Sequence, residues 1–120
     1  MLIRMAEVVI CGYARSAFTP AKKGQLRKTR PDDLAAEVIK GLLEKTGVKK
    51  EDVEDLILGC AFPEAEQGMN LARNVVFLTG LPNSVGGVTV NRFCASSMQA
   101  IHQAAGAIHS GAGDLFIAGG

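Results

Sequence analysis

The sequence predicts an α/β fold in which a mostly parallel sheet carries helices on both of its faces. Short apolar runs of strand length alternate along the chain with longer segments whose apolar residues recur every three or four positions. Parallel strands need long crossover connections, and the helical segments provide them. We therefore expect four strands and three helices in alternation, with any chemistry at the carboxyl ends of the strands.

The first strand and the first helix are predicted before residue 48. The apolar run Val8-Val9-Ile10, within residues 7–13, is typical of a strand that is buried on both faces. A helix is expected to begin at Pro31, because two acidic residues follow it and favour a helix N-terminus. The same helix is expected to end near Gly47.

The second strand is predicted over residues 53–60, and the second helix over residues 67–78, where leucine and valine recur at helical spacing. The glycine and proline of residues 80–82 end that helix. A third strand precedes residue 94, and the fourth is expected over residues 114–118.

The periodicity changes from strand to helix at Cys94. Val88 and Val90 alternate with polar residues before it, which indicates a strand. An amphipathic helix follows, to about Ser110, and its apolar stripe is expected to consist of Met98, Ile101, Ala105 and Ile108. A thiol at such a junction lies near unpaired N–H groups and the positive end of the helix dipole, which favour the thiolate. Cys94 is therefore a candidate nucleophile, or else a small apolar core residue, as free cysteines often are.

Composition excludes several classes of function. The net charge is +1, which gives no basic footprint for nucleic acid or an anionic membrane. The three cysteines include no Cys-x-x-Cys pair, which argues against a disulfide framework or a zinc site and implies a reducing compartment. Gly111 and Gly113 precede a strand instead of following one, unlike a dinucleotide-binding loop. We expect no metal and no bound cofactor.

No apolar run has the length of a signal peptide or a membrane span, and residues 1–5 are followed at once by Ala6 and Glu7. We expect a soluble, cytoplasmic protein.

Residues 90–101, VNRFCASSMQAI, closely resemble the nucleophile segment of thiolases, the enzymes that split or form 3-ketoacyl-CoA thioesters. Residues 67–73 and 80–82 resemble the helix and turn that precede this segment in the family, and residues 117–120 resemble the start of a further block. Residues 15–18, Arg-Ser-Ala-Phe, depart from the family's usual Arg-Thr-Pro-Phe. The resemblance implies the 3-ketoacyl-CoA thiolase (acetyl-CoA acyltransferase) family, with residues 1–120 as a truncated N-terminal half-domain of a layered, two-half enzyme.

The resemblance also implies a reaction. Cys94 would attack a 3-ketoacyl-CoA, release acetyl-CoA and hold the shortened acyl group as a thioester until CoA, a co-substrate, removes it. The catalytic histidine, a second cysteine and an asparagine come from the second half in this family, so the chain alone is expected to be inactive. A homodimer or homotetramer, and a partner in a β-oxidation multienzyme complex, are implied as well.

Ser97, where many thiolases have glycine, makes the segment resemble the branch that degrades fatty acids. The alternatives are an acetoacetyl-CoA-forming biosynthetic thiolase, a ketoacyl synthase-type condensing enzyme, and an inactive fragment that acts as a binding or assembly module. The ketoacyl synthases usually lack Asn-Arg-Phe before the cysteine, which counts against them.

Two other groups of residues are candidates for a functional role. His102 lies some 12 Å along the predicted helix from Cys94, and His109 lies farther, so neither is expected to serve as its base. A basic loop precedes the first helix and contains Lys22, Lys23, Arg27, Lys28 and Arg30. It predicts a solvated surface loop, with docking of CoA phosphates or of a partner subunit as the alternative.

Overall fold

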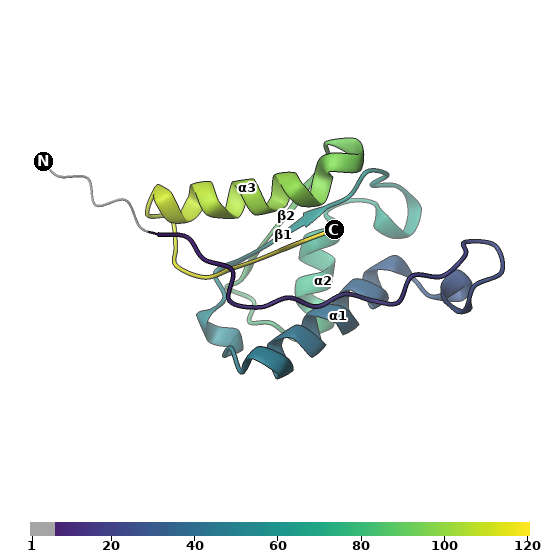
Figure 1. The fold of residues 1–120 in the computed structure, drawn as a ribbon, viewed down its shortest axis with the longest axis horizontal. Coiled ribbons are helices and arrows are strands. Elements are labelled where there is room, and N and C mark those ends of the chain that lie inside the picture. Colours follow the sequence, from purple (N-terminus) through teal and green to yellow (C-terminus); the bar gives the residue numbers. More distant parts are fainter. Residues whose placement is uncertain (1–6) are drawn as a thin grey trace, which may run out of the picture.

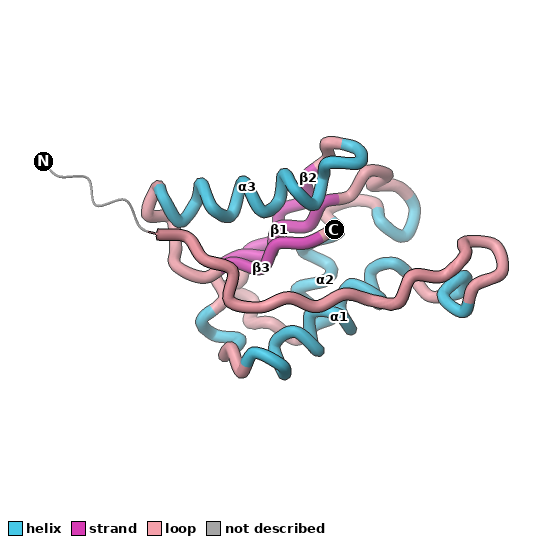
Figure 2. Tube along the Cα trace, viewed as in Figure 1, coloured by secondary structure: helices cyan, strands magenta, loops and turns pink. Residues whose placement is uncertain are grey.

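The computed structural model describes residues 7–120, and its centre is a three-stranded parallel sheet (Figure 1). Its strands are β1 (Asp55–Gly59), β2 (Gly86–Val90) and β3 (Phe116–Gly119), in the order β2-β1-β3. The α-helices are α1 (Pro31–Thr46), α2 (Leu71–Thr79) and α3 (Ser96–His109). Helix α3 covers one face of the sheet, whereas α2 covers the other and packs against α1 (Figure 2). The predicted α/β class, with helices on both faces of a parallel sheet, is confirmed.

The central strand β1 is buried on both faces, as its continuous apolar run predicts. Leu56 and Leu58 pack into a cluster with residues of α1 and α2. Ile57, between them, packs against Ala100 and Ala104 of α3. Successive side chains of a strand point to opposite faces, so this one strand joins the two halves of the core.

Helix α1 begins at Pro31 and ends before Gly47, as predicted. The Arg30 guanidinium lies 2.8 Å from the Asp32 carboxylate, and this hydrogen bond holds the pKa of Asp32 below its usual value. At the other end, Gly47 has a φ of +69° and donates its N–H to the Leu43 carbonyl at 2.9 Å. Glycine adopts this left-handed conformation without strain, which ends the helix cleanly.

Helix α2 begins at Leu71, later than the predicted start at Gln67. The reason is Asn70, whose side-chain oxygen accepts the Arg73 N–H at 3.3 Å and caps the helix. The Asn70 amide also donates to the Gly87 carbonyl at 2.8 Å, which ties the helix start to β2. A side chain that caps a helix and reaches the sheet therefore fixes the boundary.

The first predicted strand is wrong. Residues 7–13 form an irregular segment in which Val9 is 70% exposed and Ile10 is 80% exposed. Within residues 7–120 no backbone hydrogen bond joins this segment to a neighbouring strand. A strand persists only where an adjacent backbone satisfies its N–H and C=O groups. The segment instead contacts α1 through Lys45, whose ammonium donates to the Tyr13 carbonyl at 3.2 Å and lies 4.5 Å from the Tyr13 ring centroid.

Helix α3 spans the predicted residues, but it does not bury the predicted stripe. Met98 is 60% exposed and Ile101 is 47% exposed, whereas Ala100 and Ala104 face the sheet. The smaller side chains let the helix lie close to the strands, so the larger apolar residues point outward. Helical spacing identified the helix correctly, and the other two residues of the predicted stripe are half-buried, but the fully buried positions are not those predicted.

Asp55, the first residue of β1, has a buried carboxylate oxygen without a hydrogen-bond partner among the described residues. Gly86 lies directly beside it, since a Cβ added there would be 2.7 Å from that oxygen. Burial raises the pKa of Asp55, so the folded state binds this proton more tightly than the unfolded state. The ionised carboxylate therefore costs stability at neutral pH, and the cost disappears as the pH falls through the raised pKa.

We expect Asp55→Asn to raise the free energy of unfolding at pH 7 by about 1 kcal/mol, because a neutral amide is less costly to bury than a carboxylate. The gain over the unmodified protein should shrink as the pH is lowered towards 4. Thermal unfolding of both proteins at pH 7 and pH 4 measures this. A gain that stays constant between the two pH values would show that ionisation is not its cause.

None of the helices in residues 7–120 is both long and apolar enough to cross a membrane. The same residues contain no cluster of histidine, cysteine or acidic side chains arranged to hold a metal ion. The prediction that no signal peptide opens the chain rests on residues 1–6, which lie outside the described residues.

Candidate active site

Cys94 lies in a single 3-10 turn, Phe93–Ala95, which connects the carboxyl end of β2 to the start of α3. The sequence predicted this strand-to-helix junction, although the thiol precedes the α-helix instead of lying in its first turn. Cys94 is exposed and Cys60 is buried. The interpretation of Cys94 as a core residue is therefore wrong, and Cys60 takes that place. The catalytic role of Cys94 stays a prediction.

The turn has an unusual backbone conformation just before the cysteine. Phe93 has a φ of +46°, in the left-handed region that bulky side chains rarely adopt. Such a conformation costs on the order of 1–3 kcal/mol and persists only where surrounding contacts enforce it. Residues of this kind cluster at functional sites, so the strain marks this turn as more than a connection.

Two side chains enforce the turn. The Asn91 side-chain oxygen accepts the Phe93 N–H at 2.9 Å. The Ser96 hydroxyl accepts the Arg92 N–H at 2.9 Å and donates to the Phe93 carbonyl at 2.6 Å. Ser96 is itself only 5% exposed, so its hydroxyl does not exchange these partners with water. The backbone before Cys94 is thus held from both sides.

The turn is also fixed to the neighbouring strand. The Asn91 amide donates to the Ala61 carbonyl at 3.2 Å, just beyond the carboxyl end of β1. The Cys60 N–H donates to the Val90 carbonyl at 2.9 Å, which extends the pairing of the two strands. These bonds place Cys94 at the carboxyl edge of the sheet, where the fold class predicts the chemistry.

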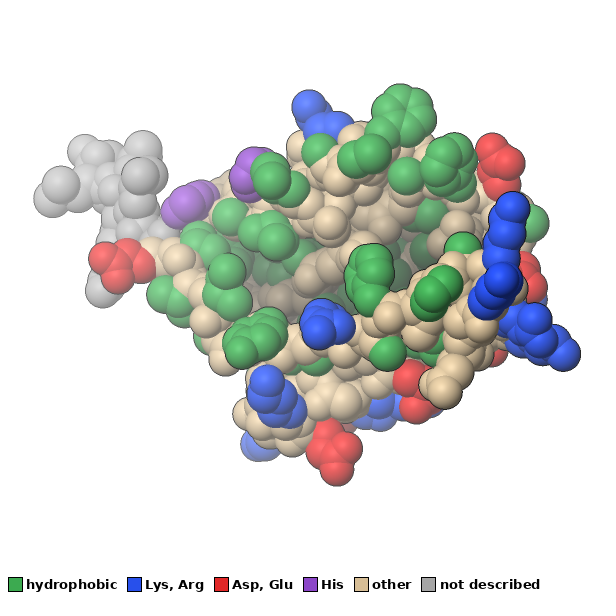
Figure 3. Space-filling view, turned by 45° about the vertical axis from the view of Figure 1, so that its right-hand side comes forward, with side chains coloured by type: hydrophobic (Ala, Val, Ile, Leu, Met, Phe, Trp, Pro, Cys, Tyr) green, Lys and Arg blue, Asp and Glu red, His purple; other side chains and the backbone are tan. Residues whose placement is uncertain are grey.

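Sequence reasoning missed Asn91 and Ser96. The signal was present, because asparagine and serine side chains often bond to backbone groups two to four residues away in turns. Helical spacing does not reveal it, because the bonds of these side chains depend on the path of the backbone through the turn. His102 and His109, which are not expected to act as the base for Cys94, are both exposed on α3 (Figure 3).

The basic loop before α1 is exposed, as predicted, and it contains a 3-10 turn at Gln25–Lys28. Arg30 is paired with Asp32 and Glu66, at 2.8 Å and 3.4 Å. Figure 3 shows lysine and arginine side chains at the surface with acidic side chains near them. The observed loop fits a solvated surface, whereas docking of CoA phosphates stays a prediction.

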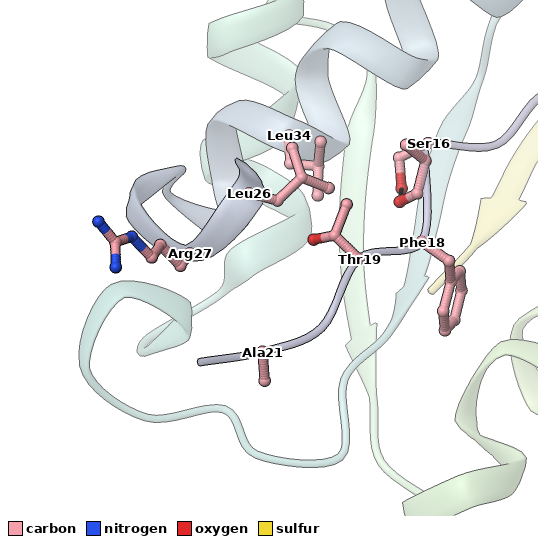
Figure 4. A pocket seen from close by; sticks show the side chains of 8 residues that line it. Ser16, Phe18, Thr19, Ala21, Leu26, Arg27 and Leu34 are labelled. Atoms are coloured by element: carbon pink, nitrogen blue, oxygen red, sulfur yellow. Dashed lines mark hydrogen bonds between the residues drawn. The ribbon is translucent and has the colours of Figure 1, made fainter. Parts of the chain in front are cut away.

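A shallow cleft of about 300 Å³ lies beside this loop (Figure 4). Its walls are Ser16, Ala17, Phe18, Thr19, Ala21, Leu26, Arg27 and Leu34. The Arg27 side chain points away from the other labelled side chains, and Phe18 is 96% exposed. The cleft does not include Cys94, so it does not extend the candidate site.

The chain is similar to known proteins over nearly its whole length. Residues 8–120 match the family model described as thiolase, N-terminal domain. A 3-ketoacyl-CoA thiolase of Bacillus subtilis is 51% identical over 97% of this chain and 30% of its own length. Those of Idiomarina loihiensis and Psychrobacter arcticus are 48% and 47% identical, over 97% and 95% of this chain and 30% and 29% of their own lengths. The chain thus spans about three tenths of the length of these curated relatives, and it belongs to the thiolase N-terminal domain family.

Proposed function

We propose that the protein containing this chain is an acyltransferase that cleaves 3-ketoacyl-CoA with CoA, giving acetyl-CoA and an acyl-CoA shortened by two carbons. The observation that carries the proposal is the exposed Cys94 at the carboxyl end of β2, directly after the left-handed Phe93, in a chain of the thiolase family. The names of the curated relatives, 3-ketoacyl-CoA thiolase, support the substrate class.

In the proposed reaction the Cys94 thiol first loses its proton to a base, which the resemblance places in the second half of the enzyme. The sulfur then attacks the 3-keto carbon, and the bond between C2 and C3 breaks. The electron pair of that bond leaves on C2 of acetyl-CoA as an enolate, which takes up a proton. The shortened acyl group remains on the Cys94 sulfur as a thioester.

In the second stage the thiol of CoA gives up its proton and attacks the thioester carbonyl. The carbon–sulfur bond to Cys94 breaks, and the acyl group leaves as acyl-CoA. Backbone N–H groups near the start of α3, including that of Cys94, would stabilise the negative charge that develops on the carbonyl oxygen. No bound cofactor is needed, because CoA enters as a co-substrate.

The setting of the reaction is part of the same proposal. The segment around Ser97 resembles that of the thiolases that degrade fatty acids. This resemblance favours a role in fatty-acid β-oxidation, with a β-oxidation multienzyme complex as a partner. We also propose a homodimer or homotetramer and a cytoplasmic location. Analytical ultracentrifugation of the purified protein and fractionation of cells would test these two points.

The function is tested with the whole protein that contains this chain. Purified protein is incubated with a 3-ketoacyl-CoA and CoA, and acetyl-CoA is measured as it forms. In a separate incubation without CoA, digestion and mass spectrometry should find the shortened acyl group on the peptide containing Cys94. Activity only with substrates carried by acyl carrier protein would instead identify a ketoacyl synthase-type enzyme.

A further inference from the structure

We propose that Ser96 is a positioning residue for Cys94, because its hydroxyl holds the backbone of the preceding turn in the left-handed conformation. The role rests on the proposed function of Cys94 as the nucleophile. Ser96 itself would touch neither substrate nor coenzyme, and it would act only through the place that it gives to the thiol.

The contacts of Ser96 are specific to this position. Its hydroxyl accepts the N–H of Arg92 at 2.9 Å and donates to the carbonyl of Phe93 at 2.6 Å. Arg92 and Phe93 are the two residues immediately before Cys94, so both bonds act on the backbone that carries the thiol. The neighbouring Ser97 makes no side-chain hydrogen bond within residues 7–120, although it is in the same turn of the helix.

The left-handed Phe93 explains why the bonds are needed. A phenylalanine with a φ of +46° tends to relax to negative φ, and the relaxation would rotate the chain just ahead of Cys94. The hydroxyl of Ser96 bonds the carbonyl of this same residue, and Asn91 bonds its N–H at 2.9 Å. Both backbone polar groups of the strained residue are therefore held, its N–H by Asn91 and its carbonyl by Ser96.

The burial of Ser96 makes the arrangement rigid. Its backbone lies against β1, because a Cβ added to Gly59 would be 2.6 Å from the Ser96 carbonyl oxygen. The serine thus joins the turn to the central strand of the sheet. The position of the thiol is therefore fixed relative to β1. Without the hydroxyl the turn can relax, and a nucleophile displaced by about 1 Å can react up to a hundredfold more slowly.

The test uses the whole protein with Ser96→Ala, and Ser97→Ala serves as the matched control. Alkylation of Cys94 and Cys60 by iodoacetamide is followed by mass spectrometry of the peptides. Cys60 is 6% exposed and reports opening of the core, whereas Cys94 reports the turn. We expect Ser96→Ala to slow alkylation of Cys94 about tenfold, because the sulfur moves away from the N–H groups at the start of α3 that stabilise a thiolate, with Cys60 as protected as before. Ser97→Ala should leave both rates within about twofold.

Two further variants keep the test decisive if Ser96→Ala does not fold. Ser96→Thr keeps a hydroxyl and should recover most of the Cys94 rate. Asn91→Ala removes the bond to the Phe93 N–H and should slow Cys94 in the same way. In turnover assays of folded variants, Ser96→Ala should lower kcat while KM for CoA stays within about twofold, because the serine does not contact substrate.

An unchanged Cys94 rate in Ser96→Ala, or faster alkylation of both cysteines, would overturn the positioning role. The first result would show that the hydroxyl is dispensable, and the second that it only stabilises the fold. The proposed function fails separately. A protein that does not cleave 3-ketoacyl-CoA, yet loses Cys94 reactivity in Ser96→Ala, supports the positioning role and refutes the thiolase activity.

Discussion

Cys94→Ala is expected to abolish thiolytic cleavage of 3-ketoacyl-CoA in the whole protein, with kcat reduced by a factor of about 10³ or more. Removal of a covalent nucleophile has effects of at least this size, because the remaining groups act only through the bond that it forms. The acyl-enzyme should vanish together with turnover. Acetyl-CoA formation and the mass of the intact protein after incubation with substrate measure the two effects.

Cys11→Ala is the matched control, since Cys11 is the other exposed cysteine and lies in the irregular segment before α1. We expect it to keep normal turnover and a normal acyl-enzyme. His102→Ala should keep turnover within about tenfold, as expected for a residue outside the proton path. Residual turnover of Cys94→Ala above one tenth of the wild-type rate, or a loss in His102→Ala as deep as in Cys94→Ala, would refute the assignment.

The features that could be predicted from sequence are those carried by local patterns. The apolar run of β1 and the helical spacing of α1 and α2 each arise within a short stretch of chain whose apolar side chains are buried. The junction at Cys94 could be predicted for the same reason, because periodicity changes there from two to between three and four. Local pattern was therefore sufficient for the class of fold and the place of the thiol.

The failures concern properties that depend on distant parts of the chain. The run Val8-Val9-Ile10 has the composition of a buried strand, yet no strand within residues 7–120 pairs with it. A strand is a property of two segments, and one segment cannot reveal its partner. In α3 the buried face was predicted from the spacing of apolar residues, whereas the residues that pack against the sheet are the small Ala100 and Ala104.

The same limit hid the residues that hold the turn. The bonds of Ser96 and Asn91 to backbone groups depend on the path of the chain between β2 and α3, which no hydrophobic pattern describes. Pattern reasoning assigns a polar residue to the surface, but Ser96 is 5% exposed. A buried hydroxyl with two backbone partners is therefore the kind of feature that only a structure reveals.

A close approach of two backbones fixes the height of α3 above the sheet. At the carboxyl end of β1, Gly59 lies against the first residues of α3. A Cβ at this position would be 2.5 Å from the Ser97 nitrogen and 2.6 Å from the Ser96 carbonyl oxygen. Both atoms are backbone, so they cannot move aside as a flexible side chain would. Glycine is required here by space and not by its backbone conformation.

Gly59→Ala is therefore expected to lower the free energy of unfolding by about 3 kcal/mol, at the upper end of the range for overpacked cores, because the start of α3 must move. The movement carries the turn with it, so alkylation of Cys94 and turnover should fall together by about tenfold or more. Thermal unfolding, alkylation rates and turnover of the folded fraction measure these effects in the whole protein.

Gly106→Ala is the control for this substitution, because Gly106 lies in α3 with nothing within 4 Å of an added Cβ. It should raise the free energy of unfolding by about 0.5–1 kcal/mol, since alanine is more favourable than glycine in the interior of a helix. It should leave Cys94 unaffected. The prediction is contradicted if Gly59→Ala is as stable as Gly106→Ala and its Cys94 is as reactive. In that case the contact at Gly59 does not set the distance between α3 and the sheet, and the turn alone positions the thiol.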